Sequence, residues 1–436
     1  MGLFFAYSRE RGDQIKMSIF DFEDYKINRR TLLKTSAAVG ASTLLYPAMS
    51  AFAKSDDPIK IGQIDPQTGT YAALGGNQIA GARLAVDQIN AKGGVMGRPL
   101  QLLVEDSAAN VGQSVQKARK LVNRDKVHFL MGAVSSSVAL AVSQAAQDMN
   151  TIYMDIGGHA DAVTGDKCSW NTFRTCSTTW LLTAGDFQAI FDKYGKRWYF
   201  ITPDYSFGHA LHHDYLTQLK KAGGTEAGNA LAPLGTTDFS SYLIKAKSAN
   251  PDALIVLGAG DDMINTLKQA TQFGLNKSMG VGGPMMELEV LQSLPDAARY
   301  GMWNMEWYWD QPNVPHVADF VDAYRKANGG KTPTARSWFG FASAHALALA
   351  TEKAKSLDAQ KVAKALEGLE LPPEVALQPN KAIYRAGDHQ LIGSEYPGTI
   401  KSGGKYPDLF QVTDVVDSSK IARSVEEKGC RITYPS

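Results

Sequence analysis

The sequence is poor in cysteine and has no excess of either charge. It contains three cysteines, and its 45 lysine and arginine residues nearly balance 44 aspartate and glutamate residues. A near-neutral chain of this kind does not favour a nucleic-acid or strongly anionic partner. Even without its first 53 residues, the chain exceeds the usual size of a single hydrophobic core, so we expect two lobes.

The sequence also lacks the short motifs that mark common enzyme classes. No G-x-S-x-G elbow, C-x-x-C pair, H-E-x-x-H helix, Walker loop or strand-linked G-x-G-x-x-G is present. His209 and His213 share one face of a predicted helix at a spacing that can bind a metal, although solvated helix histidines are the commoner explanation. We therefore expect a binding protein without enzyme activity, cofactor or metal site.

The apolar run near the N-terminus, Thr35 to Met49, falls short of the ~20 residues that a membrane-spanning helix needs. It follows Arg29-Arg30 and precedes Ala51-Phe52-Ala53. An arginine pair, a short apolar stretch and an A-x-A site in this order predict a twin-arginine export signal, residues 1–53, cleaved after Ala53. Met17 is an alternative start. No cysteine lies near the cleavage site, so we expect no lipid anchor and a soluble protein in the periplasm.

Strands alternate with helices after residue 58. The spacing of apolar residues predicts mainly parallel sheets, because helix-length segments between strands imply right-handed crossovers. In the first half the predicted strands are 59–64, 100–104, 127–131 and 151–155, and the predicted helices are 75–90, 111–122 and 138–149.

The pattern restarts in the second half, which predicts a second open α/β sheet. Lobe 1 is predicted to comprise 58–178 plus 307–383, and lobe 2 to comprise 179–306 plus 384–436, with a hinge where the chain crosses between them. The supporting strands are 198–202, 253–257 and 279–281, the helices are 180–193, 211–222, 239–248, 263–273, 314–327, 335–355 and 360–366, and β-prone stretches follow near 382–384 and 409–413.

Two of the cysteines lie close together in the sequence. Cys168 and Cys176 are predicted to form a disulfide in this exported chain, which leaves Cys430 over. A bridge from Cys430 to either of them, or three buried thiols, are the alternatives, because spacing does not fix connectivity.

Small and polar residues follow the predicted strands of the first lobe, where open α/β sheets bind their ligands. Ser135 and Ser136 open a helix after the third strand, and hydroxyls with free N–H groups there bind a carboxylate, unless a serine only caps the helix. After the fourth strand, Gly157 and Gly158 allow close approach of the backbone, and His159 offers an imidazole. A lone histidine is more often structural than a ligand contact.

Loops of the second lobe occupy the matching places. Together with those of the first lobe they are what a ligand cleft between two lobes needs. They contain Tyr205 and Phe207, Gly260 and Asp261, and Met285 after Gly283-Pro284.

From residue 58 onward the chain resembles the leucine/isoleucine/valine-binding branch of the type I periplasmic binding proteins. The residues that carry the resemblance are Ile59–Ile64 with Thr68-Gly69, Gly81-Ala82-Arg83, Ile89–Leu100, Gly132 with Ser135-Ser136-Ser137, Phe173-Arg174-Thr175, and Asp204-Tyr205-Ser206-Phe207-Gly208. The resemblance implies two Rossmann-like lobes, joined by a three-strand hinge, that close on a small ligand. It also implies an inner-membrane ABC permease as the partner, and we expect a monomer.

The resemblance further implies that Ser136 and the Gly157 loop hold a ligand carboxylate, with His159 in place of a threonine. Met285 stands where the family has an acidic residue for the ligand's α-ammonium group. Burial of an unpaired ammonium costs several kcal/mol. Unless Asp261, Asp262 or Glu287 takes over that role, we expect a small carboxylate with an apolar or aromatic body. Its predicted contacts are Tyr71, Leu74, Tyr205, Phe207 and Met285.

Three alternatives remain open from the sequence. The protein would serve the same type of transporter but bind a branched-chain amino acid or an amide. Alternatively, it would be a sensor that presents its ligand to a membrane receptor. Trp303, Trp307 and Trp309 either stack on a ligand or pack a hinge strand, and packing is the commoner explanation.

Overall fold

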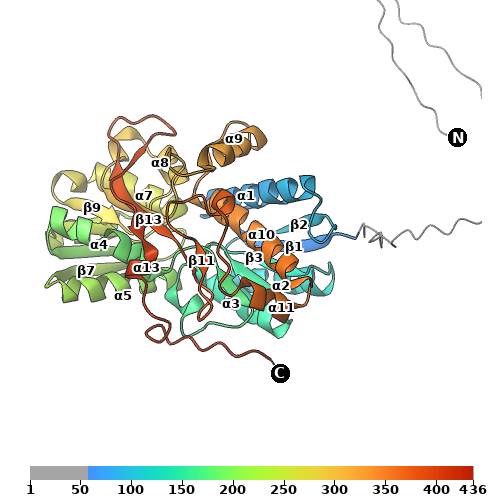
Figure 1. The fold of residues 1–436 in the computed structure, drawn as a ribbon. Coiled ribbons are helices and arrows are strands. Elements are labelled where there is room, and N and C mark those ends of the chain that lie inside the picture. The colour runs from blue at the N-terminus through green and yellow to red at the C-terminus, as the bar shows by residue number, and fades with distance from the viewer. Residues whose placement is uncertain (1–56, 436) are drawn as a thin grey trace, which may run out of the picture. The chain divides into compact units, whose positions relative to one another are not determined.

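The computed structural model describes residues 57–435, and the predicted signal at residues 1–53 lies outside them. These residues form two open α/β sheets, with helices on both faces of each (Figure 1). The predicted fold class is confirmed. None of the helices within 57–435 combines the length and apolar character needed to cross a membrane.

The first sheet has five parallel strands in the order β2-β1-β3-β4-β5. Its side chains alternate between two cores, as the two-residue period of a strand requires. Phe129 and Met131 pack toward α1, α10 and α11, and Leu130 and Tyr153 pack toward α2 and α3. The bounds are β1 Ile59–Asp65, β2 Leu100–Asp106, β3 Phe129–Gly132, β4 Ile152–Asp155, β5 Thr172–Arg174, α1 Ala72–Ala91, α2 Val111–Asn123, α3 Ser136–Asp148, α10 Ala335–Ala354 and α11 Ala359–Leu366.

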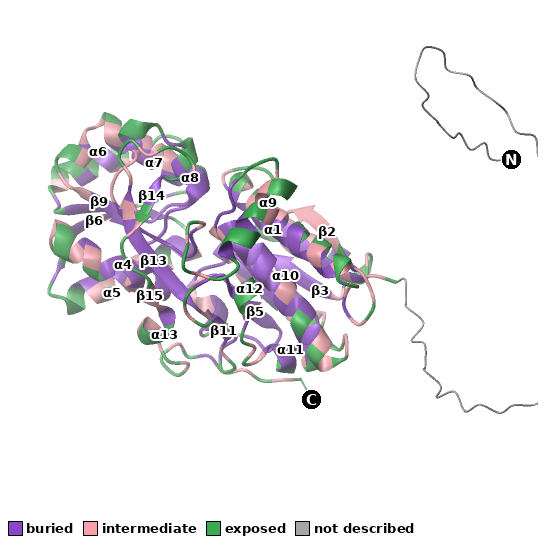
Figure 2. Ribbon diagram, turned by 45° about the horizontal axis from the view of Figure 1, so that its top comes forward, coloured by how far each residue is buried: buried purple, intermediate pink, exposed green. Residues whose placement is uncertain are grey.

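The second sheet follows the order β14-β13-β10-β9-β8-β6-β7 and is parallel from β7 to β10. Helices α6, α7 and α8 cover one face, α4 and α5 cover the other, and the strands between them are mostly buried (Figure 2). The bounds are β6 Arg197–Pro203, β7 Thr225–Ala232, β8 Ala253–Val256, β9 Gly280–Gly283, β10 Met302–Met305, β13 Ser394–Ile400, β14 Phe410–Val412, α4 Thr179–Tyr194, α5 Ser206–Lys221, α6 Ser240–Ala249, α7 Gly260–Gln272 and α8 Leu288–Ser293.

Before its last residues return to the first lobe, the chain passes between the two sheets three times. The crossings lie between β5 and α4, between β10 and α9, and between β12 and β13. β11 and β12 pair with each other in a separate two-stranded ladder rather than in either large sheet. The remaining elements are α9 Val317–Ala327, α12 Pro373–Ala376, β11 Ile383–Tyr384, β12 Leu391–Ile392, β15 Val416–Asp417 and α13 Ser418–Ile421.

One residue from each crossing joins a buried polar network at the hinge. The Ser177 N–H donates to Glu306 Oε2 at 2.6 Å, and the Ser177 hydroxyl donates to Glu395. Asn304 Nδ2 donates to the other oxygen of Glu395 at 2.6 Å. Burial and the charge of Glu306 raise the pKa of Glu395 to about 8, so this carboxyl is largely protonated at neutral pH. The crossings are therefore tied to one another by hydrogen bonds.

The tryptophans near this hinge pack into the protein. Trp303 lies in the core of the second sheet and Trp307 in the core of the first, and both are buried. Trp309 is partly buried against both cores. Packing, rather than an exposed stacking surface, accounts for these side chains.

The predicted disulfide between Cys168 and Cys176 is wrong. Cys168 bonds to Cys430, with their Cα atoms 5.6 Å apart, and Cys176 is a buried free thiol. The reason is topological: β5 carries Cys176 into the core of the first sheet, whereas Cys168 stays in the loop before that strand. The chain end returns to this loop across 262 positions, and loop-closure entropy grows only slowly with such a separation.

The end of the chain also lies elsewhere than predicted. The predicted bounds place residues 384–436 as a whole in lobe 2, but after α13 the chain runs back onto the first lobe (Figure 1). The ring of Tyr434 packs at a tilt beside that of Trp170, with ring centroids 5.7 Å apart, and its hydroxyl donates to Glu367 Oε1 at 2.6 Å. Lys428 Nζ lies 2.5 Å from Asp388 Oδ2 in the same region. The last residues thus form a fourth connection between the lobes.

Candidate functional site

Apolar side chains from both lobes meet in one buried cluster at the carboxyl ends of the strands. Lobe 1 contributes Tyr71 and Leu74 from around the start of α1, and Val134 from the loop after β3. Lobe 2 contributes Phe207 from α5 and Met285 from the loop after β9. Four of these five residues were predicted ligand contacts, and the fold brings them together. We call these five residues the interlobe cluster.

Tyr205 extends this cluster with a polar contact across the cleft. Its hydroxyl lies 2.6 Å from the hydroxyl of Tyr71, and its ring lies 6.0 Å from that of Phe207. A second hydroxyl pair, Ser137 with Ser206 at 3.0 Å, also joins the lobes. The structure therefore holds the two lobes in contact.

The serine loop after β3 leads directly into α3. Ser135 occupies the N-cap position without a side-chain capping bond, so simple capping does not explain this side chain. Ser136 is fully buried, and its hydroxyl accepts the N–H of Ala160 at 3.0 Å. Ala133 has a φ of 73°, a conformation that is uncommon for a residue with a side chain. This loop is therefore tightly fixed beside the next loop of the same lobe.

The loop after β4 is held by a buried carboxylate. Asp155 Oδ1 accepts the N–H groups of Gly157 at 3.2 Å and Gly158 at 2.7 Å. Burial raises the pKa of Asp155 to about 6, although the charge of Arg174 and these two N–H groups act in the opposite direction. Arg174 itself donates to the carbonyl oxygens of Gly158 and Ala160 at 3.0 and 2.7 Å. The backbone around Gly157 is thus set by groups of its own lobe.

His159 has a protein carboxylate as its partner. Its Nε2 lies 2.6 Å from Glu306 Oε1, and both side chains are buried. The imidazole ring lies 5.8 Å from the ring of Phe207, so it borders the interlobe cluster. Burial alone would raise the pKa of Glu306, but His159, Arg336 and the Ser177 N–H lower it below its ordinary value. His159 therefore links the edge of the cluster to the hinge.

Of the two predicted ligand contacts Gly260 and Asp261, the glycine approaches lobe 1 through its backbone, and the aspartate side chain is exposed. Gly260 has a φ of 54°, and a Cβ there would lie 2.5 Å from the carbonyl oxygen of Thr70. The N–H of Asp261 donates to that same oxygen at 3.2 Å, while its side chain is exposed. Asp262 is buried and accepts the N–H of Gly235 through both oxygens, at 3.2 and 3.1 Å. Backbone atoms of Gly260 and Asp261 therefore contact lobe 1.

Arg336 is a site residue that the sequence reasoning missed. It is the second residue of α10, is 1% exposed, and places Nε 2.5 Å from Oε1 of Glu287 in the other lobe. Its Nη2 lies 3.8 Å from the sulfur of Met285. Burial would lower the pKa of Arg336, but Glu287 and Glu306 raise it, so the guanidinium stays charged. The signal available in the sequence was a single arginine at the start of a largely apolar helix, which indicates a cation held for a specific purpose.

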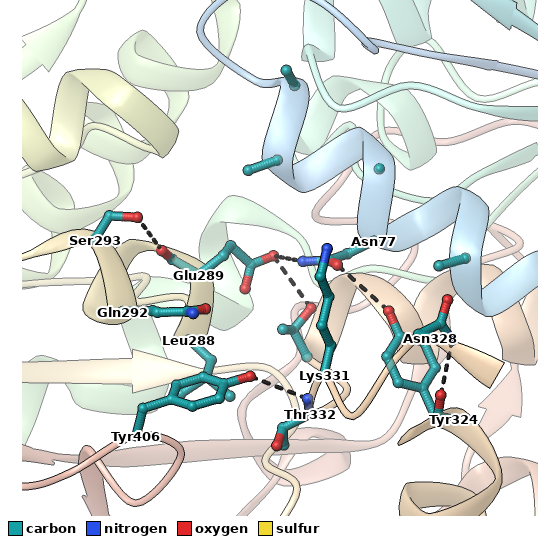
Figure 3. A pocket seen from close by; sticks show the side chains of 15 residues that line it. Asn77, Leu288, Glu289, Gln292, Ser293, Tyr324, Asn328, Lys331, Thr332 and Tyr406 are labelled. Carbon is teal, nitrogen blue, oxygen red and sulfur yellow. Dashed lines mark hydrogen bonds between the residues drawn. The ribbon is translucent and has the colours of Figure 1, made fainter. Parts of the chain in front are cut away.

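A groove of about 850 Å³ lies beside this ion pair, between α1 and α8 (Figure 3). Glu289 of α8 lines it, and its Oε1 accepts Asn77 Nδ2 at 3.0 Å and Thr334 Oγ1 at 3.2 Å, both from lobe 1. Burial and the charge of Glu287 raise the pKa of Glu289 to about 7. The remaining lining residues include Gln292, Ser293, Tyr324, Asn328, Lys331, Thr332 and Tyr406.

The predicted histidine face on α5 does not gather at one point. His209 Nε2 lies 3.1 Å from Asp204, and His212 Nε2 lies 3.0 Å from Glu226. His213 is exposed, and its Nδ1 lies 3.4 Å from Asp214. Each imidazole thus has a different carboxylate beside it.

Comparison with known proteins finds relatives that share this fold. A family model for periplasmic binding proteins matches residues 58–405. Leu/Ile/Val-binding protein homolog 7 of Brucella suis is 29% identical over 357 residues, which cover 77% of this chain and 86% of that protein. The crystal structure of a periplasmic binding protein from Burkholderia mallei superposes with a TM-score of 0.80 at 27% identity, covering 86% of this chain and 98% of that one.

A solute-binding protein of an ABC transporter from R. palustris, solved with benzoate, shares the fold with a TM-score of 0.76 at 19% identity. That likeness covers 86% of this chain and 100% of the other. The predicted export signal is confirmed by a match to twin-arginine signal sequences at residues 26–46. The matched relatives are solute-binding proteins. The chain belongs to the periplasmic binding protein family and is an exported, periplasmic binding protein of the ABC-transporter type.

Proposed function

We propose that the protein captures a small organic acid with an apolar or aromatic body and delivers it to an inner-membrane ABC permease. The acid would lie between the lobes, with its body against the interlobe cluster and Tyr205. The cluster combines aromatic rings, an aliphatic side chain and a thioether, which together bind an apolar body of variable shape. Its carboxylate would face the loops that begin with Ser135 and Gly157.

The helix start supports an anion at that place. Free N–H groups of the first turn of a helix, together with the helix dipole, stabilise a carboxylate without a dedicated cation. α3 begins at Ser136 and runs for 13 residues, so it carries a full dipole. Ser136 and the Gly157 backbone lie on the same side of the first sheet, at the ends of neighbouring strands.

The proposal is carried by what surrounds the acidic residues that could replace the one missing at Met285. Asp261 is exposed, and Asp262 accepts the Gly235 N–H. Glu287 is buried but already paired with Arg336. An ammonium group placed at the other oxygen of Glu287 would share this one carboxylate with the charged guanidinium, and a second buried cation without a counter-charge of its own costs several kcal/mol.

The amino-acid alternative has support of a different kind. The Brucella suis relative is named Leu/Ile/Val-binding protein homolog 7 and is 29% identical over 357 residues. The R. palustris protein, which shares the fold, was solved in complex with benzoate. Both ligand classes therefore suit the architecture, and the polar groups of the site decide between them.

Leucine and 4-methylpentanoate test the proposal, because they differ only in the α-amino group. We expect calorimetric titration of the protein purified from the periplasm to show 4-methylpentanoate or benzoate binding roughly 100-fold more tightly than leucine. Leucine binding that is tighter than 4-methylpentanoate binding would overturn the proposal. A thermal-shift screen of further acids, amides and amino acids extends the comparison, because a ligand of the folded state raises the melting temperature.

A further inference from the structure

The guanidinium of Arg336 is only partly used by the protein. Nε pairs with Glu287, Nη2 contacts the sulfur of Met285, and the guanidinium carbon lies over the Phe339 ring, 5.7 Å from its centroid. Nη1 is buried and has no hydrogen-bond partner within residues 57–435, and the same holds for Oε2 of Glu287. A fully structural ion pair would satisfy these atoms, because a buried N–H without an acceptor is energetically costly.

The unpaired Nη1 faces the loop that was predicted to hold a carboxylate. A Cβ on Gly157 would lie 2.6 Å from Nη1, so only glycine leaves room for the guanidinium here. The same added atom would lie 2.5 Å from the Ala133 carbonyl oxygen, which belongs to the loop that leads into Ser135. Nη1 is therefore directed at the junction of the two loops after β3 and β4.

Gln78 marks the inner boundary of this junction. Its Nε2 donates to the carbonyl oxygens of Ile156 at 2.5 Å and Ala133 at 3.3 Å, so it ties the two loops together behind the guanidinium. Its Oε1 is buried and lacks a partner among the described residues. The loops are thus fixed in position, and Nη1 of Arg336 and Oε1 of Gln78 remain able to form hydrogen bonds with a polar ligand group at the junction.

We infer that Arg336 is the specificity-determining residue of the site and binds the ligand's carboxylate through Nη1. Glu287 holds the guanidinium in place from the other lobe. This inference rests on the proposed function and makes it more specific, because it requires a charged carboxylate and not an uncharged amide of the same shape. It also couples binding to closure, since Arg336 belongs to lobe 1 and Glu287 to lobe 2.

Benzoate and benzamide, and 4-methylpentanoate and its amide, are matched probes for this role. We expect the wild-type protein to prefer each acid to its amide by 100-fold or more. In Arg336→Gln the affinity for the acid should fall by at least 100-fold while the affinity for the amide changes less than threefold. A purely structural role would weaken acid and amide equally, and that result would overturn the inference.

Two further variants keep the test valid if the single substitution disturbs folding. The double variant Glu287→Gln/Arg336→Gln removes both charges of the pair and should also lose the preference for the acid. Glu287→Gln alone leaves the guanidinium without the carboxylate that positions it, and we expect the affinity for the acid to fall up to tenfold while the preference for the acid over the amide is retained. Arg299→Gln, in the second lobe near Leu291 and Asp296, serves as a control for arginine loss and should leave the preference unchanged.

The outcomes separate this inference from the proposed function. If the wild-type protein binds the acids and Arg336→Gln binds them equally well, Arg336 is not the receptor, although the protein still captures carboxylates. If the wild-type protein binds none of the acids but binds leucine, the proposed function fails and this inference fails with it.

Discussion

Tyr71 and Tyr205 join the two lobes through hydroxyl groups that lie 2.6 Å apart. Tyr71 precedes α1, which packs on the first sheet. Tyr205 precedes α5, which packs on the second sheet. Burial raises the pKa of Tyr205 well above its ordinary value, and that of Tyr71 also rises. Both phenols are therefore neutral, and one donates to the other in the closed arrangement.

Removing either hydroxyl should weaken ligand binding by favouring the open arrangement. We expect Tyr71→Phe and Tyr205→Phe each to raise the Kd for 4-methylpentanoate about fivefold, since a hydrogen bond contributes about 1 kcal/mol. The double variant should be no worse than either single one, because the same bond is lost. Calorimetry on the four proteins measures this coupling, and fully additive effects would show that the two hydroxyls act independently.

The raised pKa of Glu289 predicts that closure of the two lobes depends on pH. Its pKa is about 7 when α8 contacts lobe 1, and the ordinary value for an exposed glutamate is lower. A raised carboxyl pKa means that the protonated form favours this contact. The stabilisation is therefore complete below the ordinary pKa and is lost as the pH rises through about 7.

We expect the affinity for benzoate to fall by roughly tenfold or more between pH 5.5 and 8 because of this group. Glu289→Gln keeps the hydrogen-bonding shape without titrating, so its affinity should vary less over the same range. Titration of both proteins at several pH values gives the difference directly. Identical profiles for the two proteins would exclude Glu289 as the source.

The bond between Cys168 and Cys430 should stabilise the protein by holding the end of the chain on lobe 1. We expect Cys168→Ser/Cys430→Ser to lower the free energy of unfolding by about 2–4 kcal/mol, measured by urea denaturation. Limited proteolysis should then cut within residues 422–435 first. Cys176→Ala is the matched control, and retention of an intact tail in that variant is the expected contrast.

The buried contact between His159 and Glu306 should contribute to the stability of the hinge more than a surface contact does. Replacing Glu306 with glutamine leaves a buried imidazole without its charged partner and removes the Ser177 contact with a carboxylate. We expect a loss of about 3 kcal/mol in the free energy of unfolding at pH 7. The exposed Glu426→Gln variant should change stability by less than about 0.5 kcal/mol. Equal effects of both substitutions would contradict a structural role for the hinge network.

Much of the fold was predictable because its strands are strongly apolar. β1, β3, β4, β6 and β8 are buried on both faces and appear in the sequence as short runs rich in β-branched and aromatic residues. β7 was missed because its sequence, T-E-A-G-N-A-L-A, is weakly apolar and occupies a sheet edge. β13 was missed because Pro397 and Gly398 argue against a strand, yet it pairs with both β10 and β14.

The candidate site was predictable on its apolar side and not on its charged side. Leu74, Phe207 and Met285 follow from their places at strand ends, which the topology of an α/β sheet fixes. Arg336 enters from a helix that is distant in the sequence from the loops it approaches. The cysteine pairing failed for the same reason, because Cys430 reaches Cys168 only through the course of the folded chain.

The path of the chain between Cys168 and Cys430 bears on the order in which folding and disulfide formation occur. A twin-arginine signal directs a chain that has already folded, and it does so from a compartment that keeps thiols reduced. The sulfur atoms of Cys168 and Cys430 must therefore be brought together by a native structure that exists without their bond. The disulfide therefore forms by oxidation after export, when folding is complete. It stabilises the folded chain and does not direct its folding.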